Sequence, residues 1–243
     1  MQKVTNAVRI FLITLALSVM SACAYAPAPQ EGRKETPTAP PQAQAQKIGP
    51  PTGQFAYVVS KIEPEVEELC RTYRPEFKCD FQIVVDYTHP DLVNAFQTLL
   101  DDGTPVVIFS IGLIKQARNL DELAFVLGHE AAHHLEGHIY RQYQSARRGA
   151  LLLGGMTAIA GGDASAIEQA QQIGATLGAR TYSKAFELEA DELGTIITKA
   201  AGFDPLRGAQ FFMRIPDPGD TFLGTHPPHA ARLETVRRTA ASF

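Results

Sequence analysis

The sequence lacks several features that would assign it to a familiar class. It contains no tryptophan, no heptad pattern and no internal repeat of solenoid period, which argues against a coiled coil or a repeat array. Its formal net charge is -4, spread over a mixed sequence. This charge argues against a general nucleic-acid binder, which would show a basic patch. No apolar run is long enough for a comfortable membrane span. The 243 residues that remain to be explained suffice for one domain of ordinary size with a hydrophobic core.

The first 23 residues have the layout of a secretory signal peptide. Lys3 and Arg9 precede an apolar run at 10–19, and small residues follow it. The tetrapeptide at 20–23, MSAC, resembles the bacterial lipobox, whose cysteine is lipidated and becomes the mature N-terminus. We therefore expect Cys23 to carry a lipid that anchors the protein to the outer membrane, facing the periplasm.

A second cleavage position would give a different product. A cut after Ala26 would release a soluble periplasmic protein, but it would place Pro27 just beyond the scissile bond, where proline usually blocks cleavage. Residues 24–53 are rich in Pro, Ala and Gln and cannot build a core. They are expected to form a disordered tether or a leader without a role, so the folded domain should span 54–243.

Two further cysteines, Cys70 and Cys79, lie at the start of this domain. In an oxidising periplasm they are expected to pair, which would tie the end of the first helix to the start of the first strand. The alternative is two buried thiols. Neither is a good candidate for a metal ligand, because no partner cysteine lies nearby.

The hydrophobic pattern of the domain predicts mostly helices and a small sheet. Strands are predicted at 81–86 and 105–110, from their β-branched runs. Helices are predicted at 54–72, 111–117, from Asn119 or Asp121 to about Arg147, at 164–200, near Pro205 and after 226–228. The apolar stretch at 149–162 is shorter than a membrane span, so we expect a glycine-interrupted core or loop segment rather than a membrane contact.

The motif that carries the most chemistry is His129-Glu130-x-x-His133. A helix places residues four apart on one face, so the two imidazoles can bind one metal ion. Glu130 then lies beside that ion, close enough to handle a bound water. Residues 121–127 give this helix an apolar face, and charged or imidazole groups on a buried helix are costly unless they are paired or ligated.

A second histidine pair, His134 and His138, repeats the same spacing one residue later. On an unbroken helix this pair would point roughly 140° away from the first one, so all four cannot bind one ion. Only the first pair has a glutamate directly after its first histidine. We therefore expect His134 and His138 to be surface or structural groups, with a second metal site as the alternative.

The third ligand must come from elsewhere in the chain. Metzincin spacing is excluded, because Glu136 and Ile139 occupy the positions of its glycine and its third histidine. A later segment offers four carboxylates: Glu187, Glu189, Asp191 and Glu192. Glu187 and Asp191 share a helix face, from which Glu189 points away. One of the two could bind the metal while the other accepts the spare N–H of a ligand histidine; the alternative is a solvated acidic face.

Taken together, five motifs resemble one family of proteases. They are NAF at 94–96, GHEAAH at 128–133, RTYSKAFELEAD at 180–191, GFDP at 202–205 and THPPHAAR at 225–232. They resemble the zinc endopeptidases of metallopeptidase family forty-eight, which includes the HtpX heat-shock proteases, the CAAX prenyl-protein (Ste-type) proteases and short periplasmic lipoproteins. The match covers most of residues 55–238, and the chain is most similar to the short periplasmic branch.

This resemblance implies a fold and a set of roles. The fold would be α+β and mostly helical, a gluzincin-like zincin domain with a small sheet. Glu187 would be the third ligand of one zinc ion, and Asp191 would support the ligands from behind. Glu130 would be the general base. His226 is our candidate for stabilising the oxyanion, with a structural role at a helix start as the alternative.

Two further residues or segments have roles that stay open. Arg232 could orient the segment around His226 or bind substrate. An extended substrate could add to the edge of the strand at 106–110.

The expected function is therefore a zinc endopeptidase acting on unfolded or misassembled envelope proteins, in protein quality control. Two other classes stay open: a latent or non-catalytic chaperone-like adaptor, in which His226 closes the zinc site, and a non-proteolytic zinc hydrolase.

Overall fold

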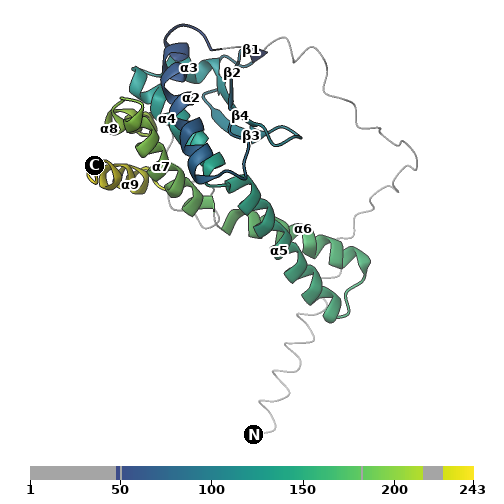
Figure 1. Ribbon diagram of the computed structural model, residues 1–243. Helices are drawn as coiled ribbons and strands as arrows, with labels where there is room; N and C mark the ends of the chain where they lie inside the picture. Colours follow the sequence, from purple (N-terminus) through teal and green to yellow (C-terminus); the bar gives the residue numbers. More distant parts are fainter. Residues whose placement is uncertain (1–47, 50, 182, 216–226) are drawn as a thin grey trace, which may run out of the picture. The chain divides into compact units, whose positions relative to one another are not determined.

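The computed structural model describes residues 48–49, 51–181, 183–215 and 227–243. Cys23 and His226, two of the predicted functional residues, lie outside these ranges. Figure 1 shows the described elements, which are β1 (Ile48–Gly49), α2 (Gly53–Tyr73), β2 (Gln82–Asp86), β3 (Ala95–Leu99), β4 (Pro105–Ser110), α3 (Ile111–Gln116), α4 (Leu120–Leu135), α5 (His138–Ile159), α6 (Ala164–Thr181), α7 (Ser183–Ala200), α8 (Pro205–Gly208), the 3₁₀ helix η2 (Ala209–Arg214) and α9 (His229–Ala240). Within these ranges, no helix combines the length and apolar character needed to cross a bilayer.

The four strands form one mixed sheet in the order β1-β2-β4-β3. Strands β2 and β4, both expected from the sequence, are parallel neighbours, while β1 and β3 pair antiparallel at the two edges. Strand β3 was not expected, because its sequence AFQTL has no long β-branched run and its side chains are only partly buried. Since β4 is enclosed by β2 and β3, the expectation that a substrate adds to the strand at 106–110 is wrong: the open edge belongs to β3.

The core lies between the sheet and helices α2 and α4. The apolar stripe expected on the first helix is buried, with Val58, Ile62 and Val66 at its centre. The ring centroids of Phe55 on α2 and Phe109 on β4 lie 4.5 Å apart. At the end of α2, Cys70 and Cys79 form a disulfide with their Cα atoms 5.6 Å apart, so this end is tied to the segment that leads into β2.

The long helix expected to run from residue 119 or 121 to about Arg147 is two helices. Helix α4 ends at Leu135, and α5 begins at His138. Gly137, between them, has φ 64°, in the left-handed region that glycine adopts without steric cost and that commonly ends helices. The expectation of one unbroken helix is therefore wrong, and the chain changes direction directly after the two histidine pairs.

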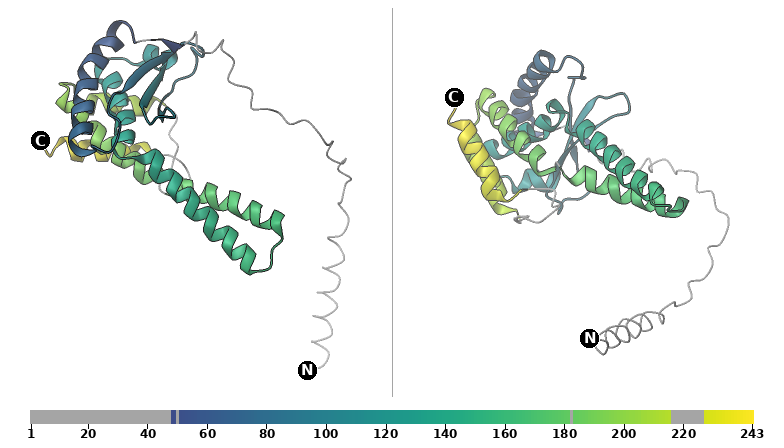
Figure 2. Two further views of the ribbon diagram at one scale, coloured as in Figure 1. Left: turned by 45° about the vertical axis from the view of Figure 1, so that its right-hand side comes forward. Right: turned by 90° about the horizontal axis from the view of Figure 1, so that it is seen from below.

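Helices α5 and α6 form an antiparallel hairpin and lie side by side over their length (Figures 1 and 2). Residues 149–159 are the last turns of α5, whereas the sequence indicated a core or loop segment. Leu151, Leu152, Met156 and Ile159 are exposed on it. Contact with α6 stabilises the helix despite its glycines, and α6 covers only one side of the apolar stretch. The chain then returns to the core through α7.

Candidate metal centre

Helix α4 carries the H-E-x-x-H motif and is fixed at its first turn. Asn119 caps the helix, its side-chain oxygen accepting the backbone N–H of Glu122 at 3.0 Å. The buried Glu122 carboxylate in turn accepts two hydrogen bonds from the Arg214 guanidinium of η2. A bidentate pair of this kind restricts orientation as well as distance. The direction of α4, and with it the direction of its histidines, is therefore set by its N-terminal contacts.

Helix α7 approaches α4 closely at the motif. A Cβ atom at Gly194 would lie 2.9 Å from the backbone nitrogen of His129, closer than real Cβ contacts come. Only glycine allows the two helices to approach to this distance. The face of α7 that looks toward α4 buries Glu187, Ala190 and Asp191. The close crossing thus brings two carboxylates to the histidines of α4.

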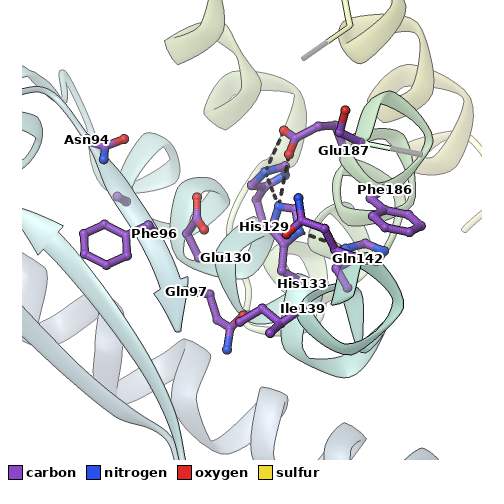
Figure 3. A pocket seen from close by; sticks show the side chains of 13 residues that line it. Asn94, Phe96, Gln97, His129, Glu130, His133, Ile139, Gln142, Phe186 and Glu187 are labelled. Carbon is purple, nitrogen blue, oxygen red and sulfur yellow. Dashed lines mark hydrogen bonds and ion pairs between the residues drawn. The ribbon is translucent and has the colours of Figure 1, made fainter. Parts of the chain in front are cut away.

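The three predicted ligands meet at one point. The Nε2 atoms of His129 and His133 are 3.2 Å apart, and each lies 3.5 Å from a different oxygen of the Glu187 carboxylate, Oε2 for His129 and Oε1 for His133 (Figure 3). A tetrahedral zinc ion with bonds of about 2.0–2.1 Å holds its ligand atoms about 3.4 Å from one another. The two nitrogens and the Glu187 carboxylate are therefore spaced as the ligands of one zinc ion are, with one ligand atom from each residue within 4.8 Å of the others. Two histidines and one glutamate are also a ligand set that catalytic zinc sites use.

Behind the first histidine lies a buried ion pair. The Nδ1 atom of His129 is 2.9 Å from Asp191 Oδ1, and Arg232 donates to both oxygens of Asp191 at 2.8 and 2.7 Å. Arg232 itself lies 3.5 Å from the ring centroid of Phe212. Although burial acts to lower the pKa of His129, its hydrogen bonds to Asp191 and Glu187 raise that pKa to about 9. Asp191 thus lies where the resemblance placed it, and Arg232 orients it.

Glu130 borders a cavity of about 340 Å³ at the metal site. Figure 3 shows its carboxyl group between β3 on one side and the two histidines on the other. Burial raises the pKa of Glu130 to about 7, and a hydrogen bond with the Gln97 backbone counteracts part of this rise. A carboxyl group with a pKa near neutrality can both accept and return a proton at neutral pH.

The open edge of β3 forms one wall of this cavity. Ser110 donates its backbone N–H to Asn94, and Leu100 donates its own to Thr104. In an antiparallel pair the hydrogen-bonded positions alternate, so the even-numbered residues of β3 pair with β4. The backbone groups of Ala95, Gln97 and Leu99 consequently point to the open edge, in agreement with the contact between Gln97 and Glu130.

The second histidine pair is divided between two environments. As expected, His134 faces away from the metal site: its Nε2 atom lies 2.8 Å from the carbonyl oxygen of Lys78, and its ring packs on Phe77 and Phe81. The expectation that His138 also points away from the first histidine pair is wrong. Because α4 ends at Leu135, the His138 ring turns back, and its Nδ1 atom lies 2.9 Å from Nδ1 of His133.

Sequence reasoning also missed the partners of His138. Its Nε2 atom is 3.0 Å from a carboxylate oxygen of Glu189, the residue expected to point away from the site, and Arg141 forms an ion pair with the same carboxylate. The signal that could have revealed this arrangement is Gly137, a residue type that frequently follows the last turn of a helix.

Comparison with known proteins agrees with this geometry. The model of the family described as "Peptidase family M48" matches residues 56–240. A putative beta-barrel assembly-enhancing protease of Vibrio cholerae is 34% identical over 168 residues, which are 62% of this chain and 33% of that protein. The beta-barrel assembly-enhancing protease of Yersinia pestis is 30% identical over 169 residues, again 62% and 33%. The chain thus matches about a third of the length of these curated relatives. The family match spans most of the chain and includes every described residue of the metal centre, so this chain belongs to peptidase family M48.

Proposed function

We propose that the protein is a zinc-dependent endopeptidase that hydrolyses peptide bonds in proteins of the bacterial cell envelope. The observation that carries the proposal is one constellation: two histidines and a glutamate spaced to hold one zinc ion, a buried carboxyl group beside them, and an open strand edge bordering the same cavity. Each part serves a different need of peptide hydrolysis, namely activation of water, proton transfer and alignment of the chain to be cut.

The metal would be held by His129, His133 and Glu187, one ion per chain. Three protein ligands leave the fourth corner of the tetrahedron free, and a zinc ion bound there would lower the pKa of a water molecule and polarise the scissile carbonyl. Asp191 accepts the Nδ1 hydrogen of His129, so that the Nε2 lone pair faces the metal. The protein thereby fixes both the position and the tautomer of this ligand.

Glu130 is the proton carrier in this proposal. Its carboxylate takes a proton from the attacking water and returns it to the nitrogen of the leaving amine. Its place between the ligand histidines and β3 allows it to reach both sides of the bond to be cut (Figure 3). Burial raises the pKa of Glu130 to about 7 in the metal-free protein, and the charge of a bound zinc ion would lower it, so that the carboxylate would be ionised and ready to accept a proton.

The substrate would bind as an extended strand along β3. The outward N–H and C=O groups of Ala95 and Leu99 and the outward C=O of Gln97 can pair with any polypeptide backbone, whatever its side chains, while the Gln97 N–H contacts Glu130. Pairing of this kind requires an unfolded or locally extended segment, because a folded chain has already used its own backbone groups. This requirement favours unfolded or misassembled proteins as substrates and a role in quality control.

The cell envelope is proposed as the site of action. The N-terminal signal-peptide pattern with Cys23 supports export and a lipid anchor in the outer membrane, and the Cys70–Cys79 disulfide suits an oxidising periplasm. The relatives named for enhancing β-barrel assembly make outer-membrane proteins the substrate class to test first.

The alternative is a latent or non-catalytic adaptor built on the same zinc fold. In that case His226, which lies outside the described residues, would occupy the fourth corner of the zinc tetrahedron and exclude water. The two functions differ in turnover rather than in metal content. Digestion of casein and of an unfolded outer-membrane β-barrel protein, with and without a zinc chelator, separates them. Chelator-sensitive cleavage that is lost in Glu130→Gln supports the protease; a zinc-loaded protein that cleaves neither substrate supports the adaptor.

A further inference from the structure

A chain of hydrogen bonds extends from the second ligand histidine to the surface. It runs from His133 to His138 at 2.9 Å, from His138 to Glu189 at 3.0 Å, and from Glu189 to both terminal nitrogens of Arg141. The first two members are largely buried, whereas the side chains of Glu189 and Arg141 are 38% and 41% exposed. The metal site is thus connected to an ion pair that can be altered without opening the core.

The hydrogen atoms in this series of hydrogen bonds can be arranged in only one way when His133 binds a metal ion. A neutral imidazole that coordinates through Nε2 carries its hydrogen on Nδ1, so His133 donates to Nδ1 of His138. His138 then carries its own hydrogen on Nε2 and donates it to the Glu189 carboxylate, which can only accept when it is ionised. Arg141 keeps that carboxylate ionised and in place. Every donor in the chain therefore meets an acceptor.

Packing holds the His138 ring in this orientation. The rings of His138 and Phe186 are stacked, with centroids 4.5 Å apart and planes inclined by 10°, and the Arg141 guanidinium lies 4.3 Å from the centroid of Phe186. Phe186 directly precedes the ligand Glu187 in the sequence. The Phe186 ring thus contacts both His138 and Arg141, next to the metal site.

The other ligand histidine has an equivalent arrangement. His129 donates to Asp191, Asp191 is held by Arg232, and Arg232 lies over Phe212. On the side of His133 the carboxylate is that of Glu189, and His138 lies between the two, in contact with both. Each ligand histidine is therefore connected to one carboxylate, one arginine and one phenylalanine.

A second metal site is the competing interpretation of these residues. Ligand atoms of Glu136, His138 and Glu189 lie within 4.8 Å of one another. However, the Glu189 oxygens already contact Arg141, and Nδ1 of His138 already contacts His133. An ion at this position would have to compete with a guanidinium for the same carboxylate. The contacts favour a hydrogen-bonding role.

We infer that His138, held by Glu189 and Arg141, is the positioning residue for the zinc ligand His133. It accepts the Nδ1 hydrogen of His133, which fixes the tautomer and ring orientation that direct Nε2 to the metal. The inference rests on the proposed function, because it assumes that a metal binds between His129, His133 and Glu187. It adds the support of the second ligand histidine, which the sequence did not reveal.

The test is the zinc affinity of the purified protein, measured by competition with chelators of known affinity. His138→Phe keeps the aromatic stacking but removes the acceptor, and it should lower the affinity about 10- to 100-fold, the usual loss when an outer partner of a ligand is removed. His138→Asn should lose less, because its Oδ1 can take the place of Nδ1. Glu189→Gln should also weaken binding, whereas Glu192→Gln, at an exposed position of the same helix, should leave it unchanged.

A double variant shows whether Glu189 acts on zinc binding through His138 or independently of it. Glu189 acts on the metal only through His138 in this inference, so His138→Phe combined with Glu189→Gln should bind zinc as well as His138→Phe alone. Additive losses would contradict the inference, and so would an unchanged affinity in His138→Phe. Two zinc ions per chain, reduced to one by Glu189→Gln, would show the second metal site instead.

Separate control measurements test whether each variant folds and whether the proposed function holds. The melting temperature of each metal-free variant shows whether its fold is intact. If His138→Phe does not fold, the half-exposed Glu189→Gln and Arg141→Gln carry the test, and unchanged zinc affinity in both overturns the inference. A wild-type protein that binds no zinc contradicts the proposed function as well. A wild-type protein that binds zinc and cleaves its substrate, while His138→Phe retains full affinity, contradicts this inference alone.

Discussion

His133 and His138 touch through their Nδ1 atoms, 2.9 Å apart, although five residues separate them in the sequence. The contact exists because α4 ends at Leu135 and Gly137 reverses the chain before α5 begins. Together with the contact of His129 to Asp191, it gives each ligand histidine a partner for the nitrogen that does not face the metal. The centre is therefore built from two supported imidazoles and one glutamate, and its parts can be tested one at a time.

Replacing the proposed base should abolish cleavage without removing the metal. Glu130→Gln keeps the size of the side chain but cannot accept a proton, so the rate of peptide hydrolysis should fall about 100- to 10,000-fold. Zinc content, measured by atomic emission, should stay at one per chain, because Glu130 is not among the ligands. Glu192→Gln serves as the matched control with normal turnover. Full activity in Glu130→Gln would assign the base elsewhere.

Removing the third ligand should release the metal. Glu187→Ala leaves two histidines, and its zinc affinity should fall by more than the roughly 100-fold loss that bounds the removal of an outer partner. Measuring His138→Phe under the same chelator competition shows which of the two residues contributes more to zinc affinity. If Glu187→Ala retained stoichiometric zinc at wild-type affinity, the third ligand would be another residue.

Zinc binding should depend on pH through one histidine. In the metal-free protein the pKa of His129 is raised from 6.5 to about 9, while burial lowers that of His133 to about 3. Between about pH 7 and 9 zinc must therefore displace one proton from its ligands, that of His129, and the apparent affinity should rise about tenfold per pH unit before levelling off near pH 9. Titration calorimetry in buffers of different ionisation enthalpy counts the released proton. An affinity that is constant over this range would contradict the prediction.

The same shift has a consequence for the stability of the metal-free protein. Because the folded-state pKa of His129 lies above its unfolded value, the protonated form favours folding. This contribution is fully present below about pH 6.5 and is lost as the pH rises through about 9. Saturating zinc should reverse the trend, since the metal requires the neutral imidazole. Melting temperatures of both forms over pH 6 to 10 test the sign.

The open edge of β3 can be tested through its backbone. Gln97→Pro removes an N–H that points to the cavity and not to β4, so the sheet should tolerate the change better than a proline at Thr98, whose backbone pairs with Val106. Because the same N–H contacts Glu130, we expect a lower kcat/KM for protein substrates from weaker strand pairing and from a perturbed Glu130 together, with normal zinc content. Gln97→Ala, which keeps the N–H, is the control. Equal loss in both variants would assign the effect to the side chain.

The disulfide should stabilise the domain. Cys70 and Cys79 are nine residues apart, and closing a loop of this length contributes about 2–3 kcal/mol. Cys70→Ala combined with Cys79→Ala should lower the melting temperature by roughly 5–10 °C. Scanning calorimetry of the oxidised protein and of the double variant measures the difference. Identical melting temperatures would show that the bond adds nothing to stability.

Local sequence patterns predicted much of the fold. The stripe of Val58, Ile62 and Val66 gave the first helix, and the β-branched run at 105–110 gave β4 with its observed bounds. Strand β3 escaped prediction, because its residues have little β-propensity of their own and its pairing is supplied by β4. The hairpin helix through 149–159 was missed for a related reason: its glycines pointed to a loop, while contact with α6 stabilises the helix.

The sequence by itself determined the chemistry of the centre, because the spacing of His129, Glu130 and His133 within one helix is a local property. It also narrowed the third ligand to a short acidic segment, and the family resemblance selected Glu187 within it. Only the tertiary structure decided which groups support the ligands. Arg232 reaches the site because α9 packs on α7, and His138 reaches it through the chain reversal at Gly137. Such contacts depend on how whole helices pack, which no local pattern encodes.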